Sequence, residues 1–147
     1  MDADNTGALD ARADLAYQAG EFELAQDLYL RLGRGPSSLG EGQLLYRRGE
    51  IAEALGEERV AVELYKEAVE TNPSLRVGWE AMARIYLFRG DERHAVEALE
   101  RLWELIPVEE YETTKQLGEV LLRSLLFLGR FDEAEETLVK LHALEIE

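Results

Sequence analysis

The stretch from Arg76 to Pro107, RVGWEAMARIYLFRGDERHAVEALERLWELIP, decides the fold of this chain. Its first half carries apolar residues at the i, i+3, i+4, i+7 spacing of one helical face: Trp79, Met82, Ala83 and Tyr86. Gly90 then interrupts the pattern where a helix end needs a residue free to adopt positive φ. A second apolar helical face runs over residues 95–106 and ends at the proline. The stretch therefore predicts two antiparallel helices joined by a tight glycine turn.

The spacing of Gly90 and Ala95 recurs three more times along the chain. The other copies are Gly20/Ala25, Gly56/Ala61 and Gly129/Ala134. Successive glycines are 36, 34 and 39 residues apart, and a similar helical face follows each alanine. One short helix pair cannot bury both of its faces, whereas stacked pairs bury a continuous core. The sequence therefore predicts four stacked pairs, with small residues where the helices cross: the four alanines on the second helices, and Ala13, Gly49 and Ala83 on the first.

This repeat resembles the tetratricopeptide repeat (TPR), whose period is about 34 residues. The family's pattern of Trp, small residue, Tyr, Ala and Pro is met by Trp79, Ala83, Tyr86, Ala95 and Pro107. The resemblance implies an all-α fold, a right-handed α-solenoid of four TPR-like helix-turn-helix repeats. We place the repeats at about residues 8–35, 42–75, 76–107 and 108–147, in a single domain over 8–147. Residues 1–7 are expected to form a disordered acidic N-terminus.

The fourth repeat departs from the pattern. Gly118 stands where Trp79 stands in the third repeat, and Leu122 replaces the small residue. We expect its first helix to be long, from about Glu109 to Leu128.

Composition excludes several classes of site. The chain has 147 residues and no cysteine, so disulfides and thiolate metal sites are impossible. The two histidines, His94 and His142, belong to no metal-ligand spacing. The glycines at 33–42 lack the Gly-Lys-Ser/Thr sequence of a phosphate-binding loop. No catalytic set of side chains is visible either, so we expect no metal, no cofactor and no enzymatic activity.

The net charge of −15 limits the partners. Such an acidic chain repels nucleic acid and anionic lipid surfaces, which leaves a protein or peptide as the expected partner. The acidic surface is equally explained by solubility alone. No apolar run approaches the length of a membrane span, and the N-terminus does not resemble a signal peptide. We therefore expect no direct membrane binding and take a cytoplasmic location as the default.

The resemblance also implies a binding surface, because the first helices of successive pairs line a concave groove in TPR-like arrays. The function expected from it is a scaffold or adaptor that holds a segment of a partner protein. The expected partner-binding residues are Tyr46, Arg47, Arg84, Leu87, Phe88, Arg123, Leu126 and Phe127. The other expected groove residues are Asp10, Asp14, Tyr17, Gln18, Glu50, Glu53, Glu80 and Glu119.

Two features of this groove have a second interpretation. Arg84 and Arg123 can clamp a carboxylate of the partner, or pair with the glutamate four residues earlier on the same helix. The Leu-Phe pairs at 87–88 and 126–127 can line the groove or pack into the core. Asp10 and Asp14 stand where some family members place a cationic clamp, which argues against an adaptor for acidic chaperone tails.

The end of the chain offers an alternative function, self-association. The last helix of such an array exposes a face built for a neighbour unless a polar helix covers it. Here the apolar residues without obvious cover are Leu138, Leu141, Leu144 and Ile146. Either they form a homodimer contact, or the chain continues into a longer protein.

Overall fold

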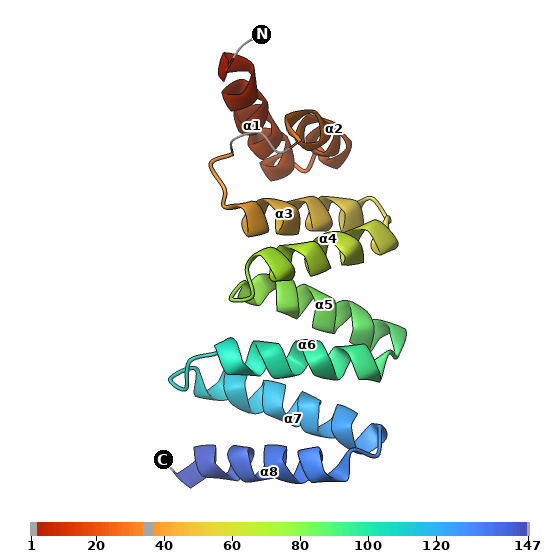
Figure 1. Cartoon of the computed structure of the whole chain (residues 1–147), viewed down its shortest axis with the longest axis vertical. Coiled ribbons are helices and arrows are strands. Elements are labelled where there is room, and N and C mark those ends of the chain that lie inside the picture. Colours follow the sequence, from red (N-terminus) through yellow and green to blue (C-terminus); the bar gives the residue numbers. More distant parts are fainter. Residues whose placement is uncertain (1–2, 34–36, 147) are drawn as a thin grey trace. The chain divides into compact units, whose positions relative to one another are not determined.

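The structure is a computed structural model that describes residues 3–33 and 37–146. Helices and their connections make up these two ranges, with no strand in either. The helices, drawn in Figure 1, are α1 (Ala3–Gln18), α2 (Phe22–Leu32), α3 (Glu41–Ala54), α4 (Glu58–Thr71), α5 (Arg76–Arg89), α6 (Glu92–Leu105), α7 (Tyr111–Phe127) and α8 (Phe131–Ile146). The predicted fold class, an all-α helical-repeat solenoid, is confirmed.

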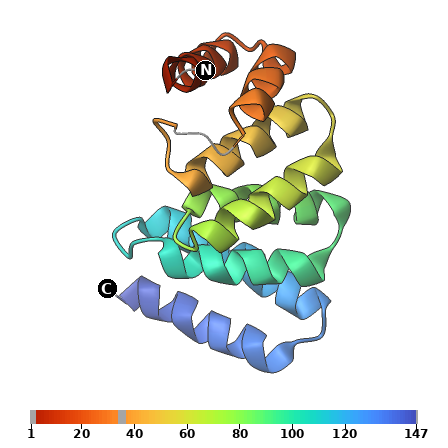
Figure 2. The ribbon, with the colours of Figure 1, turned by 45° about the horizontal axis from the view of Figure 1, so that its top comes forward.

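The chain divides into two compact units, residues 1–75 and 76–147. Unit 1 contains the helix pairs α1/α2 and α3/α4, and unit 2 contains α5/α6 and α7/α8. Within each unit successive helices pack against each other. In Figures 1 and 2, α3 lies beside α4, α5 beside α6, and α7 beside α8.

The repeat glycines form the turns inside the pairs, as predicted. Gly20, Gly56, Gly90 and Gly129 have φ angles of 78°, 79°, 72° and 72°. This left-handed conformation is disfavoured for residues with a β-carbon, so glycine ends each first helix and turns the chain into the second.

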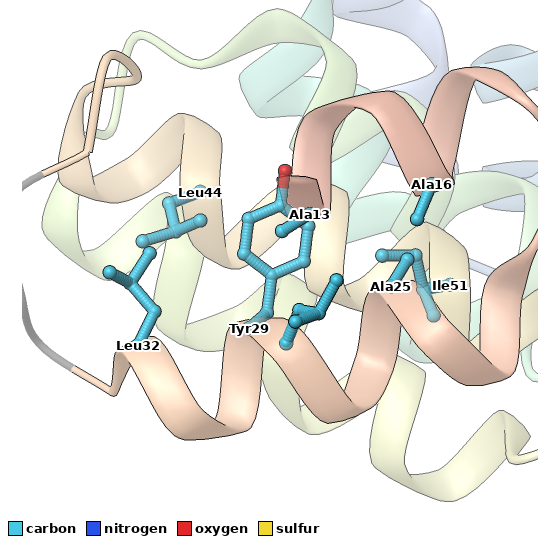
Figure 3. Close-up of a cluster of buried hydrophobic side chains, with 8 residues drawn as sticks. Ala13, Ala16, Ala25, Tyr29, Leu32, Leu44 and Ile51 are labelled. Carbon is cyan, nitrogen blue, oxygen red and sulfur yellow. The ribbon is translucent and has the colours of Figure 1, made fainter. Parts of the chain in front are cut away.

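Small residues let the helices of unit 1 approach closely. Its core contains Ala13 and Ala16 of α1, which face Ala25 and Tyr29 of α2, and Ile51 of α3 closes the same cluster (Figure 3). Ala13 and Ala25 are fully buried, so α1 and α2 cross at the alanines that the repeat pattern places there.

In unit 2, α6 packs against both α5 and α7. The buried face of α6 is made of alanines and aliphatic residues: Ala95, Val96, Ala98, Leu99 and Leu102. Asp91 caps α6 by accepting a hydrogen bond of 3.3 Å from the backbone N–H of His94.

The irregular fourth repeat is completed by side chains from other helices. A β-carbon on Gly118 would lie 2.6 Å from Cδ2 of Leu141 on α8 and 3.0 Å from Cζ2 of Trp103 on α6. The indole ring and the leucine therefore occupy the space that a larger residue at position 118 would need.

Two predicted boundaries need correction. Helix α1 begins at Ala3, so the expected disorder over residues 1–7 is wrong for residues 3–7; residues 1 and 2 lie outside the described ranges. Asn5 and Gly7 cost a helix only about 1 kcal/mol each or less, which does not break the register that continues into Leu9 and Ala13. Helix α7 spans Tyr111–Phe127, two residues shorter at its start than predicted and one at its end.

Candidate functional site

In unit 1, the predicted groove residues of α1 and α3 bond to one another. The Arg47 guanidinium pairs with the Asp14 carboxylate and donates a 3.4 Å hydrogen bond to the Tyr29 hydroxyl. It also lies 4.5 Å from the centre of the Tyr17 ring, in a cation–π contact. The arginine thus joins α1, α2 and α3, with both of these bonds made by its Nη1 atom.

Glu50 is a second centre of the same network. Its carboxylate accepts hydrogen bonds from the hydroxyls of Tyr17 (2.7 Å) and Tyr46 (3.0 Å). Burial and then the bond to Glu50 raise the pKa of Tyr17 to about 12. Nearby, Glu53 accepts a 2.8 Å bond from the Tyr65 hydroxyl, and burial raises the pKa of that phenol as well.

Asp10 was predicted to face the groove, and the structure corrects this. Its side chain is buried, and its carboxylate accepts hydrogen bonds from Ser37 Oγ (2.6 Å) and the Ser38 backbone N–H (2.8 Å). These donors belong to the segment that leads into α3, and they hold the short Asp10 side chain beside it. Asp10 therefore anchors the connection between the two helix pairs of unit 1.

In unit 2, α5 and α7 start side by side. Arg76, the first residue of α5, donates two 2.9 Å hydrogen bonds to the carboxylate of Glu110, which precedes α7. In the chain, α6 follows α5 and runs antiparallel to it, and α7 then runs antiparallel to α6, so α5 and α7 point in the same direction. Residues at equal distances before Gly90 and Gly129 therefore lie near corresponding ends of α5 and α7.

The exposed aromatic residues of unit 2 occupy such equivalent positions. Phe88 is 89% exposed and Phe127 is 76% exposed, and each lies two residues before its turn glycine. Leu126 is also exposed, whereas Leu87 is half-buried. Core packing, the second interpretation of these pairs, is thereby excluded for both phenylalanines and for Leu126.

The two arginines of this surface lie one helical turn before the phenylalanines. Arg84 and Arg123 are exposed. Glu80 pairs with Arg76 at 3.2 Å, and Arg84 makes an interaction of its own. Within the described ranges no ion pair joins Glu119 to Arg123. The structure therefore leaves Arg84, Phe88, Arg123, Leu126 and Phe127 exposed on α5 and α7, with Leu87 half-buried.

The apolar residues predicted on α8 do not share one face. Leu141 is only 8% exposed because it packs against Gly118, so its predicted exposure is wrong. Leu144 is half-buried, Leu138 is exposed, and the Ile146 side chain lies outside the described part. The outer face of α8 instead adds Phe131 and Val139, both exposed, to Leu138.

Sequence reasoning missed a cleft of ≈490 Å³ between α6, α7 and α8. Its lining includes Trp103 and Glu104 of α6, Leu121 of α7, and Glu136 and Lys140 of α8. No local pattern marks it, because its walls come from three helices. The sequence signal that could have indicated the cleft is Trp103, a large aromatic residue that the structure leaves half-buried.

The described residues contain no group of three or more His, Asp or Glu side chains placed to hold a metal ion. None of the helices, over the same residues, has the length and apolar character needed to cross a bilayer.

Comparisons with known proteins agree with this geometry. Residues 42–75, which hold α3 and α4, match the model of the tetratricopeptide repeat. A search of the curated proteins found no match.

Solved structures with the same fold include three proteins of low sequence identity. The type III secretion translocator chaperone SycD of Yersinia enterocolitica is 19% identical with a TM-score of 0.66, over 88% of this chain and 89% of its own. The nearly identical TPR-like repeats of a putative kinesin light chain of Podosopora anserina are 21% identical with a TM-score of 0.59, over 95% and 74%. The MamA protein is 16% identical with a TM-score of 0.55, over 96% and 92%.

Proposed function

We propose that this chain, which contains a segment matching the tetratricopeptide repeat and shares the fold of TPR-repeat proteins, is a protein-interaction scaffold that holds a partner segment across α5 and α7 of unit 2. One of its structural neighbours is by name a chaperone of a translocator, a protein that acts on another protein. That name supports the general class of function, while the surface is proposed from unit 2 itself.

The observation that carries the proposal is the matched exposure of Phe88 and Phe127. A phenylalanine ring left in water forgoes the roughly 1.5–3 kcal/mol that its burial would contribute. We propose that two such rings, at equivalent places on α5 and α7, form an apolar surface that a partner covers. Aromatic residues at the centre of an interface are also among those that contribute most to binding.

The flanking arginines define the chemistry of the partner segment. Arg84 and Arg123 are exposed guanidinium groups, which bind carboxylates through two parallel hydrogen bonds. We propose a segment that places apolar side chains against Leu87, Leu126 and the two phenyl rings, with a carboxylate in reach of the arginines. Outside this contact the partner is neutral or basic, since the whole chain carries a net charge of −15.

Tyr46 and Arg47, also predicted contacts, are left out of the proposed surface. Their polar atoms bond Glu50, Asp14 and Tyr29 within unit 1. A partner would have to replace these bonds, so we assign the two residues to the internal network.

The test begins with capture of partners from native lysate and their identification by mass spectrometry, followed by calorimetric titration of the mapped partner segment. Phe88→Ala/Phe127→Ala is expected to weaken binding at least about thirtyfold, because truncation of a central aromatic residue costs about 1–2 kcal/mol or more. Phe131→Ala is the matched control: this ring is 68% exposed but lies on α8. Unchanged affinity in the double variant, or equal loss in the control, would refute the proposed surface.

Self-association is a second candidate, favoured by the outer face of α8. Phe131, Leu138 and Val139 are exposed there. Sedimentation equilibrium of the purified chain should then show a dimer that Leu138→Glu/Val139→Glu converts to monomer. A single-chain mass at all concentrations would exclude this candidate and leave the α5/α7 surface untouched.

A further inference from the structure

The cleft between α6, α7 and α8 combines an apolar floor with an acidic rim. The floor is formed by Trp103 and Ile106 from the end of α6, Leu121 from α7 and Leu144 from α8. Val108 borders the cleft and is 62% exposed. A volume of ≈490 Å³ is within the range of ligand pockets and accommodates one or two large apolar side chains.

Carboxylates from two helices surround this floor: Glu100 and Glu104 on α6, and Glu133 and Glu136 on α8. Burial raises the pKa of Glu100, Arg130 opposes the effect, and Glu133 and Glu104 add to it. Among the described residues, two cations lie near these four carboxylates. Arg130 is held by Glu133 through a 2.7 Å bond from Nε, and Lys140 lines the cleft from α8, one helical turn after Glu136.

The equivalent groove of unit 1 shows that the fold does not need two of these carboxylates. Counted from the turn glycines, Glu100 and Glu133 take the places of Leu30 and Val60. Those two residues line a smaller cleft of ≈230 Å³ between α2, α3 and α4. Leucine and valine therefore satisfy the packing at these positions, and the carboxylates of Glu100 and Glu133 are particular to unit 2.

Lys140 shows that the cleft accepts a cation beside an aromatic ring. Its Nζ lies 5.9 Å from the centre of the Trp103 ring, within the range of a cation–π contact. The lysine itself is exposed, so a cationic side chain from outside can take its place.

From these observations we propose that the α6/α7/α8 cleft is a second protein-binding site, whose ligand is a cationic amphipathic segment. The segment inserts an apolar side chain against Trp103 and places lysine or arginine side chains on the glutamate rim. Charge complementarity selects this occupant, because an acidic segment would meet four carboxylates in the rim. The cleft shares α7 with the α5/α7 surface, but neither Phe88 nor Phe127 lines it.

The test uses a fluorescein-labelled amphipathic peptide of about 14 residues, four helical turns, with leucines on one face and lysines on the other. Binding to the full chain is followed by fluorescence anisotropy. Two control peptides carry glutamate in place of the lysines, or serine in place of the leucines. We expect binding of the first peptide only, and weaker binding at higher salt.

Variants then locate the contact. Glu104→Gln/Glu136→Gln is expected to weaken binding about tenfold, from two rim charges of somewhat under 1 kcal/mol each. Val108→Ser should weaken peptide binding because it removes apolar surface beside the floor of the cleft. Lys140→Gln should strengthen peptide binding because it removes the competing cation. The matched control Glu112→Gln/Glu135→Gln removes the same charge from exposed positions outside the cleft and should leave affinity unchanged. Phe88→Ala/Phe127→Ala should leave it unchanged as well.

Several results would overturn the proposal. One is equal binding of the lysine and glutamate peptides, and another is no binding of either. Equal loss in the rim variant and in the matched control would show attraction to net charge alone. Finally, if the chain dimerises and Val108→Ser dissociates the dimer, the cleft is a contact between copies. Loss of binding in the phenylalanine variant but not in the rim variant would place the peptide on the α5/α7 surface instead.

Discussion

Gly49 of α3 lies directly against the ring of Tyr65 on α4: a β-carbon at position 49 would stand 2.5 Å from Cε1 of that ring. The ring has no room to withdraw, because Tyr65 is fully buried and its hydroxyl is bonded to Glu53 at 2.8 Å. This contact is what brings the two helices of the second repeat together. A residue with any side chain at position 49 must push them apart.

We therefore expect Gly49→Ala to destabilise the protein. Alanine gains about 1 kcal/mol in helix propensity, but overpacking a rigid contact costs about 1–3 kcal/mol or more, so the net effect should be a loss. Urea unfolding followed by circular dichroism measures the change. Gly7→Ala is the control, since position 7 lies in α1 with nothing within 4 Å of its β-carbon, and it should be neutral or stabilising. A Gly49→Ala variant as stable as the wild type would contradict the close contact.

The helix crossing in the third repeat gives a second prediction. Ala95 is fully buried at the start of α6, and leucine in its place is expected to lower the free energy of unfolding by about 1–3 kcal/mol through overpacking. Ala143→Leu on the exposed side of α8 should change it by less than about 0.5 kcal/mol. Thermal melts of the two variants separate the outcomes, and equal melting temperatures would place the crossing elsewhere.

The repeat pattern was sufficient to predict the helix pairs, because its signals are local and occur four times. Gly90 and its counterparts indicate the turns, and Ala95 and Gly49 indicate the helix crossings. Neither inference depends on a residue that is distant in the sequence. The sequence did not decide whether Phe88 is exposed, since a side chain at the end of a first helix can face the core or the solvent.

What the sequence did not predict are contacts between helices. Arg47 was predicted to meet a partner, and in the structure it pairs with Asp14, 33 residues earlier on another helix. Leu141 looked uncovered, yet Gly118 leaves a space that it fills. A repeat pattern specifies which helical face a residue occupies, whereas side-chain pairing across repeats depends on helix spacing that no single repeat encodes.

Asp10 gives a prediction about acid stability. Burial opposes its ionisation, but the hydrogen bonds from Ser37 and Ser38 outweigh it, and the pKa of Asp10 lies below its ordinary value of 3.8. A lowered pKa in the folded state stabilises the protein above the unfolded pKa, and this contribution is lost as the pH falls through the folded pKa.

Asp10→Asn should therefore destabilise the protein by about 1–2 kcal/mol at neutral pH, through loss of charge-assisted hydrogen bonds. The difference from wild type should shrink once the pH falls below 3.8. Urea unfolding at a series of pH values measures both curves. Asp27→Asn, on the exposed side of α2, serves as control. A difference that stays constant down to the lowest pH would show that the Asp10 carboxylate is not the group that titrates.

The tyrosine network of unit 1 gives the last prediction, at alkaline pH. Burial and the bond to Glu50 raise the pKa of Tyr17 from 10.0 to about 12. A raised pKa in the folded state means that the stabilisation is complete below the unfolded pKa and is lost as the pH rises through 10 toward 12. The difference in tyrosinate absorbance between wild type and Tyr17→Phe should therefore have its midpoint near 12, and Glu50→Gln should move that midpoint toward 10. A midpoint that Glu50→Gln leaves unchanged would mean that burial alone raises the pKa and that the bond joining α1 to α3 is absent in solution.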